Sequence, residues 1–250
     1  MKGKFIAGLV SVAALSAASS ASANVLPVGT WQFNEGSGTV AHDATWHPDN
    51  GTLQGGASWS AGRFSGALSF DGTGSVDVPD NSALEPASVS VSAWVNSSTS
   101  PGKFKYIVAK GASGCLAASY GLYTGPNGGL EFYASSNGGT SWVQSPDAGN
   151  QVWDGQWHNV VGTYDGSTVR LYVDGQQVGS GSADTAPIAY GLPTSNDLTF
   201  ANYAGCSGLN YSGRIDQVRV FDRALGAGEV RLGYMASHYL PTGFPFDLML

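Results

Sequence analysis

The sequence predicts an all-β fold: a two-sheet antiparallel sandwich with one short helix near the C-terminus. Segments that alternate apolar and polar residues recur along the chain and are bounded by Gly, Pro, Asn or Asp, as half-buried strands are. Glycine accounts for 36 of 250 residues and aromatic residues for 11%, whereas only 12% are charged, which favours short strands and tight turns. About a dozen such strands in one domain indicate a sandwich or a barrel.

The predicted strands follow one another with turn residues between them. In order they are GTWQF (29–33), GALSFDG (66–72), SVDVP (75–79), SVSVSAWVNS (88–97), KYIVAKG (105–111), SYGLYTG (119–125), GLEFYAS (129–135), HNVVGTYDG (158–166), TVRLYVDG (168–175), DLTFANY (197–203) and GRIDQVRVFD (213–222). In the fourth of these, Trp94 shares a face with Ser90 and Ser92. A large aromatic residue on this otherwise hydroxylic face predicts that both faces of the strand are covered.

The stretch RALGAGEVRLGYMA (223–236) is the one predicted helix. Its side chains Leu225, Val230, Leu232 and Met235 would line one side, and its glycines keep it short. The last residues, 239–250, are an apolar tail with two prolines, and are interpreted as an edge strand, a packed tail or an association surface.

The first 23 residues have the order of a secretory signal peptide. Lys2 and Lys4 precede an apolar run from Phe5 to Ala18, and Ala21-Ser22-Ala23 supplies small residues for cleavage. We therefore predict a secreted or extracellular protein, periplasmic or cell-surface in a bacterium, with one domain over residues 24–238. The apolar run is shorter than the ~20 residues that span a bilayer, so no membrane insertion is expected.

Charge and cysteine content restrict the partners and the compartment. Loss of Lys2 and Lys4 changes the formal charge from -7 to -9, which disfavours nucleic acid and anionic membranes as partners. The two cysteines, Cys115 and Cys206, are expected to form one disulfide in an oxidising compartment. The alternative is a reactive thiol or metal pair, but neither cysteine has a histidine cluster beside it.

Five longer motifs run from Thr30 to about Tyr234. They are WQFNEGSGTVAHDATWHPDNGTL, FSGALSFDGTGSVDVPDNSAL, SVSAWVNSS, WHNVVGTYDGSTVRLYVDG and GRIDQVRVFDRALGAGEV. In this order they resemble the laminin-G-like (LamG) domains of the concanavalin A-like lectin/glucanase superfamily. The resemblance implies a jelly roll whose concave face and rim loops are the usual ligand surface. Because that fold carries glucanases, lectins and bare scaffolds, function has to be argued from the site.

Catalytic motifs are missing from the sequence. The superfamily's glucanases carry Glu-x-Asp-x-x-Glu or Glu-x-Asp-x-Glu on one strand, and none of Glu35, Glu85, Glu131 and Glu229 begins such a pattern. His158 is interpreted as a structural histidine rather than a catalytic base. We therefore predict a protein that is not an enzyme, with a glycan-active hydrolase of unfamiliar site as the rival.

The resemblance also implies a structural calcium ion where the N-terminal loop meets the last strand. The matching positions are Glu35, Asp43 and Asp216. Calcium takes six to eight oxygens from carboxylates, carbonyls and water. The alternative is that Glu35 and Asp43 receive turn hydrogen bonds, and that Asp216 pairs with a neighbouring arginine.

Two segments around the cysteines combine aromatic and polar residues. Sugars stack on aromatic rings while polar groups fix their hydroxyls. A disulfide would join the segments into one rim, which we predict to bind carbohydrate, a cell-surface glycoconjugate or, alternatively, a protein. The predicted ligand residues are Tyr120, Tyr123, Glu131, Tyr133, Trp142, Asn202, Tyr203 and Tyr211. The alternative for each tyrosine is a place in the packed core.

Overall fold

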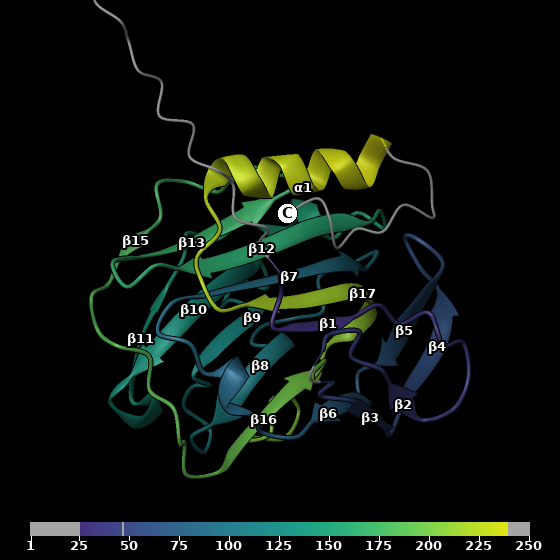
Figure 1. Ribbon diagram of the computed structural model, residues 1–250, viewed down its shortest axis with the longest axis horizontal. Coiled ribbons are helices and arrows are strands. Elements are labelled where there is room, and N and C mark those ends of the chain that lie inside the picture. The colour runs from purple at the N-terminus through teal and green to yellow at the C-terminus, as the bar shows by residue number, and fades with distance from the viewer. Residues whose placement is uncertain (1–25, 47, 240–250) are drawn as a thin grey trace, which may run out of the picture.

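Two antiparallel sheets lie face to face in the computed structural model, which describes residues 26–46 and 48–239 (Figure 1). The fold is the predicted sandwich with one helix near the C-terminus. The predicted signal peptide at 1–23 and residues 240–250 of the predicted tail lie outside the described residues.

The first sheet has nine strands and contains the long central strands. Its order is β14 (Gln176–Gln177), β13 (Thr168–Val173), β12 (His158–Tyr164), β7 (Val89–Asn96), β17 (Ser212–Phe221), β5 (Gly66–Asp71) and β4 (Ala57–Ala61). In addition, β1 (Gly29–Trp31) pairs with β17, and β15 (Ser182–Ala183) pairs with β13.

The second sheet has eight strands and carries the loops that contain both cysteines. Its order is β11 (Ser141–Gln144), β10 (Leu130–Ser136), β9 (Tyr120–Thr124), β8 (Tyr106–Ala112), β16 (Ser195–Phe200), β6 (Ser75–Val78), β3 (Gly51–Gln54) and β2 (Val40–Ala41). Three single-turn 3-10 helices lie in the connections: η1 (Ser82–Leu84), η2 (Asn137–Gly139) and η3 (Asn150–Val152).

The hydrophobic core lies between the sheets. Val169 and Leu171 of β13 face it, as do Leu130 and Phe132 of β10. Gly162 of β12 allows the sheets to approach here, because an added Cβ would lie 2.1 Å from the Phe132 ring. The alternation predicted from the sequence therefore decides which residues of β10 and β13 enter the core.

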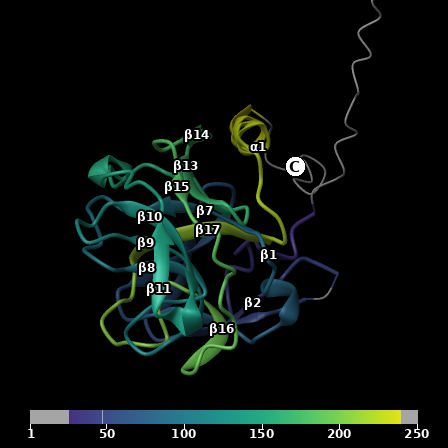
Figure 2. The same ribbon diagram turned by 90° about the vertical axis from the view of Figure 1, so that its left-hand side faces the viewer.

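Helix α1 (Ala227–Tyr239) covers the outer face of the first sheet (Figures 1 and 2). Trp94 stacks on Tyr234 with 6.1 Å between ring centroids, so the second face of β7 is covered as predicted. Val230 is buried, but the prediction was wrong for Leu232 and Met235, which are 63% and 41% exposed. Only a narrow stripe of this short helix contacts the sheet. Within the described residues, no helix is long and apolar enough to cross a membrane.

Candidate ligand-binding site

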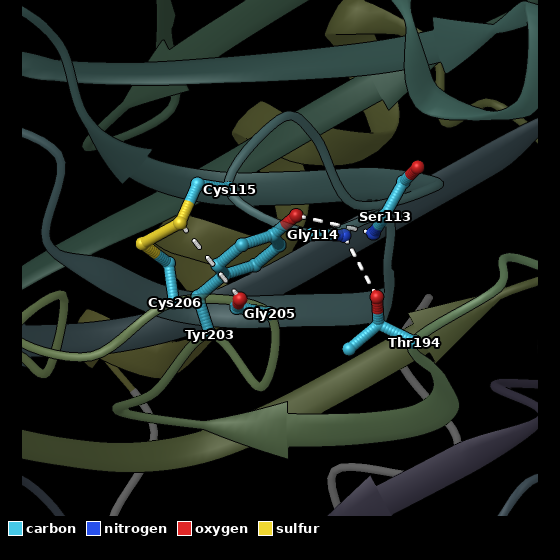
Figure 3. The surroundings of a disulfide bond; sticks show 7 residues. All are labelled: Ser113, Gly114, Cys115, Thr194, Tyr203, Gly205 and Cys206. Atoms are coloured by element: carbon cyan, nitrogen blue, oxygen red, sulfur yellow. Dashed lines mark hydrogen bonds between the residues drawn. A yellow bond between two sulfur atoms is a disulfide. The ribbon is translucent and has the colours of Figure 1, made fainter.

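A disulfide joins the two loops that the sequence singled out. Cys115 follows β8 and Cys206 follows β16, and their Cα atoms lie 4.9 Å apart, which confirms the predicted pair (Figure 3). Two hydrogen bonds of the Cys115 loop support the cystine. The backbone N–H of Ser113 donates to the hydroxyl of Tyr203, in the Cys206 loop, at 3.2 Å, and that of Gly114 donates to Thr194 Oγ1, just before β16, at 2.8 Å. The Cys115 loop is thus held to both ends of β16.

Four tyrosines cluster beneath these loops, on the outer face of the second sheet. Tyr106 of β8 lies 4.7 Å from Tyr203 and 5.4 Å from Tyr123 of β9, measured between ring centroids. Tyr133 of β10 meets Tyr123 edge-on at 4.9 Å. Because Phe132 and its alternate neighbours face the core, Tyr133 points to the opposite side. These aromatic contacts give a rigid platform.

A pocket of about 340 Å³ opens between this tyrosine cluster and the cystine. We call it the cystine pocket. Phe104, Leu116 and Trp142 stand at its mouth, 39%, 51% and 45% exposed. The complete lining consists of Phe104, Tyr106, Cys115, Leu116, Ala117, Tyr123, Tyr133, Trp142, Cys206 and Leu209.

The tyrosine hydroxyls of the pocket wall are bonded to other protein groups. Tyr106 and Tyr133 share a hydrogen bond of 3.1 Å, and the Ala118 N–H donates to the Tyr133 hydroxyl at 2.7 Å. The Tyr123 hydroxyl donates to Glu131 Oε2 at 3.0 Å. Burial raises the pKa of all three tyrosines well above 10, so they stay neutral. Their rings, more than their hydroxyls, are presented to a ligand.

Glu131 lies behind Tyr123 and does not line the pocket. Burial raises the pKa of its carboxyl, the Tyr123 hydroxyl lowers it, and the charge of Asp147 raises it further. Its carboxyl accepts the hydrogen bond that fixes the Tyr123 ring.

The structure brings together only some of the predicted ligand residues. Tyr123, Tyr133 and Trp142 line the cystine pocket, with Tyr203 packed behind it. Tyr120 and Tyr211 lie in the core instead. Their hydroxyls donate to the backbone oxygens of Leu84 and Asn96 respectively. Asn202 is partly buried and also lies outside the lining.

Five lining residues were not predicted: Phe104, Tyr106, Leu116, Ala117 and Leu209. Tyr106 was within a predicted strand, but a register shift between Tyr106 and Val108 interrupts the alternation of β8. Leu116 adjoins Cys115. Its position beside a predicted cystine is the sequence feature that could have placed it in the pocket lining.

The predicted calcium ligand Asp43 is fully occupied by protein donors. Its Oδ1 accepts from the N–H groups of Thr30 and Thr45 at 2.8 and 3.0 Å. Its Oδ2 accepts from the Thr45 hydroxyl and the Asp49 N–H at 2.8 and 3.0 Å. Asp43 therefore organises the loop between β2 and β3, which matches the turn alternative from the sequence.

Glu35 and Asp216 each keep a buried carboxylate oxygen without a hydrogen-bond partner in the structure. The other oxygen of Asp216 accepts from the N–H groups of Arg63 and Phe64 at 2.8 and 3.3 Å. Burial raises the pKa of Asp216 to about 7. Within the described ranges, no three His, Cys, Asp or Glu side chains form a group that could hold a metal ion. A cation at either carboxylate would need backbone oxygens as further ligands.

His158 takes part in a separate acidic cluster. Its Nδ1 lies 2.7 Å from Asp174 Oδ2, and its Nε2 lies 3.2 Å from Asp154 Oδ1. The hydrogen bond between His158 and Asp174 joins β12 to the turn after β13. This hydrogen bond is the main cause of a raised His158 pKa. This arrangement favours the structural interpretation of His158.

The raised pKa predicts that protonated His158 stabilises the fold. Its contribution should be complete below the unfolded value of about 6.5 and be lost as pH rises through the higher folded value. The difference in unfolding free energy between wild type and His158→Gln should therefore be largest at low pH and shrink towards pH ~9. Urea unfolding across this range measures it, and a pH-independent difference would contradict the assignment.

The fold and the motifs are matched by known proteins. The laminin G-like profile of the concanavalin A-like lectin/glucanases superfamily matches residues 70–231. The chain belongs to this superfamily. No curated protein sequence matches the chain.

Several solved structures share the superfamily fold with this chain. Domain 4 of AbnA, an extracellular GH43 arabinanase from Geobacillus stearothermophilus in complex with arabinotriose, is 17% identical, with a TM-score of 0.63 over 83% of this chain and 97% of that one. A Trypanosoma rangeli sialidase is 17% identical, with a TM-score of 0.61 over 86% of this chain and 34% of the sialidase. A structure of botulinum neurotoxin type C, whose cell entry depends on two ganglioside molecules, is 15% identical. Its TM-score is 0.61 over 86% of this chain and 52% of the toxin chain. At these identities the likeness shows the fold.

Proposed function

We propose that the chain is a secreted, non-catalytic module that binds a carbohydrate or a cell-surface glycoconjugate in the cystine pocket. The observation that carries the proposal is the pocket itself, because tyrosine rings from three strands and the Trp142 ring from a fourth converge under a cystine. Aromatic faces stack on the apolar faces of sugars. Two proteins with the same fold also interact with glycans: the arabinanase domain is in complex with arabinotriose, and cell entry of the toxin depends on gangliosides.

The absence of catalytic machinery is part of this proposal. Glycoside hydrolysis usually needs two carboxyl groups about 5–9 Å apart across the scissile bond. Among the described residues that line the cystine pocket, none is Asp or Glu. A ligand held there meets rings, aliphatic groups and sulfur, so binding without cleavage is the expected outcome.

A glycan array probed with the mature, disulfide-bonded protein tests the binding proposal. We expect hits that calorimetry reproduces and that release no reducing sugar during long incubation. Release of reducing ends would instead support a hydrolase. A folded protein without any glycan hit would leave the protein-interaction alternative, which the three exposed apolar side chains at the pocket mouth favour.

We also propose a structural calcium ion held by Asp216, with Glu35 and backbone oxygens as further ligands. The support is chemical: both carboxylates keep a buried oxygen without a partner. A Cβ on Gly62 would lie 1.9 Å from the Gly66 carbonyl and 2.7 Å from Asp216 Oδ2, so a backbone oxygen lies near this carboxylate. A bound cation would add to the positive charge of Arg219, which already lowers the pKa of the buried Asp216 carboxyl.

The calcium proposal predicts a higher unfolding midpoint in millimolar calcium than in chelator, because the native state alone would bind the ion. Asp216→Asn should abolish this difference while retaining an acceptor for the Arg63 and Phe64 N–H groups. Differential scanning fluorimetry at pH 8 measures both proteins. No calcium effect on the wild type would remove the proposal.

A further inference from the structure

The lining of the cystine pocket has an unusual chemistry for a sugar site. Among the described residues that form it, none carries a charged or amide side chain. Five are aromatic, namely Phe104, Tyr106, Tyr123, Tyr133 and Trp142; the remainder are aliphatic residues and the cystine. Sugar hydroxyls buried here would lose water without gaining side-chain amides or carboxylates, which is unfavourable.

The tyrosine hydroxyls of the pocket wall and the ammonium group of the neighbouring Lys105 are already engaged. The hydroxyls of Tyr106 and Tyr133 bond to each other, and that of Tyr123 bonds to Glu131. Lys105, between two lining residues in the sequence, donates its ammonium group to the backbone oxygen of Gly208. A ligand hydroxyl would have to displace these bonds to gain a partner, whereas an apolar group would leave them intact.

The ring geometry suits one further aromatic ring. Tyr123 and Tyr133 meet at 81°, and Tyr106 and Tyr133 at 83°, the edge-to-face arrangement that aromatic pairs prefer. Trp142 stands free at the mouth, 45% exposed. The volume of about 340 Å³ lies near the lower end of the roughly 300–1,000 Å³ range of small-molecule pockets, so one ring system fits it better than a sugar chain.

We infer that the cystine pocket receives an aromatic substituent of a glycan, with the sugar itself held at the mouth. This inference rests on the proposed function and specifies its ligand class: an aryl-substituted sugar. The substituent lies between the tyrosine cluster and Leu116, and Trp142 flanks the sugar that carries it. At the exposed mouth the sugar hydroxyls stay hydrated.

Paired glycosides test the inference. The probes are the phenyl and methyl β-glycosides of glucose, galactose, xylose and arabinose, titrated by calorimetry into the mature, disulfide-bonded protein. For each sugar that binds, the phenyl member should bind about tenfold more tightly, since it alone buries a ring among the tyrosines. Phenol alone should bind more weakly than the phenyl glycoside.

Leu116→Ala should weaken the phenyl glycoside several-fold and leave the methyl glycoside nearly unchanged. Its matched control is Leu232→Ala, which removes an exposed leucine from helix α1 and should change neither affinity. Equal affinities for the phenyl and methyl members would overturn the inference while leaving glycan binding intact. Phenol binding as tightly as the phenyl glycosides would also overturn it. If the array gives glycan hits but none prefers a phenyl group, the inference fails and the proposed function stands. If no glycan binds at all, the proposed function fails.

Discussion

Replacing both cysteines with serine should lower the free energy of unfolding by about 4–5 kcal/mol. The disulfide closes a loop with a sequence separation of 91 residues, and chain-entropy reasoning gives this magnitude for a loop of that length. Urea denaturation of wild type and of Cys115→Ser/Cys206→Ser measures the loss. Wild type treated with a reductant should match the double variant.

The same substitution should weaken the ligand site more than the loss of fold stability explains. Cys115 and Cys206 form one wall of the cystine pocket, and their loops also hold Leu116 and Leu209. Without the cystine these loops must be ordered when the ligand binds, at a cost in affinity. A folded double variant with unchanged stability would contradict the stabilising role, and one with unchanged glycan affinity would contradict the role in the pocket.

Asp43→Ala should cost about 3–5 kcal/mol of unfolding free energy, because four donors to one carboxylate lose their acceptor together. The N–H of Thr30 is a buried donor of strand β1. Loss of its acceptor therefore also affects the pairing of β1 with β17. Asp43→Asn retains one acceptor oxygen and should lose roughly half as much. Chemical denaturation of the three proteins measures these differences.

Calcium distinguishes this structural role of Asp43 from the ligand role that the family resemblance implied. The loss in Asp43→Ala should be the same in millimolar calcium and in chelator. Asp216→Asn is the comparison, since its effect should depend on calcium. A loss in Asp43→Ala that appears only with calcium would restore Asp43 as a metal ligand.

The strands were predictable where they are long and alternate regularly. In β13, Val169 and Leu171 face the core and Tyr172 does not, as the pattern indicates. Short or polar strands carry too little pattern: β2, β3, β4, β11, β14 and β15 were not predicted. These strands are set by pairing with neighbours rather than by their own residues.

The tyrosines that line the pocket were only partly predictable, because strand alternation and long-range packing decide which of them reach it. Tyr120 and Tyr123 are three positions apart, so a regular strand places them on opposite faces, and only Tyr123 reaches the pocket. Applying that rule would have excluded Tyr120. Tyr211 precedes β17, and its place in the core depends on contacts with Asn96, 115 residues away, which local pattern does not encode.

The cystine itself was predictable because an even pair in a protein with a signal-peptide pattern is expected to close. The pocket beside it was not, since the register shift in β8 and the loop around Leu116 arise from tertiary packing. Asp43 shows the same limit: the N–H group of Thr30 that it accepts lies 13 residues earlier in the chain.

Two exposed tryptophans test most directly whether the cystine pocket binds the glycan. Trp142 stands at the pocket mouth, whereas Trp46, 92% exposed in the loop between β2 and β3, does not line the pocket. Calorimetry with the strongest array hit should show affinity about 10- to 30-fold weaker in Trp142→Ala, because an aromatic anchor is removed, and unchanged in Trp46→Ala. Equal affinities in wild type and Trp142→Ala would contradict glycan binding in the cystine pocket.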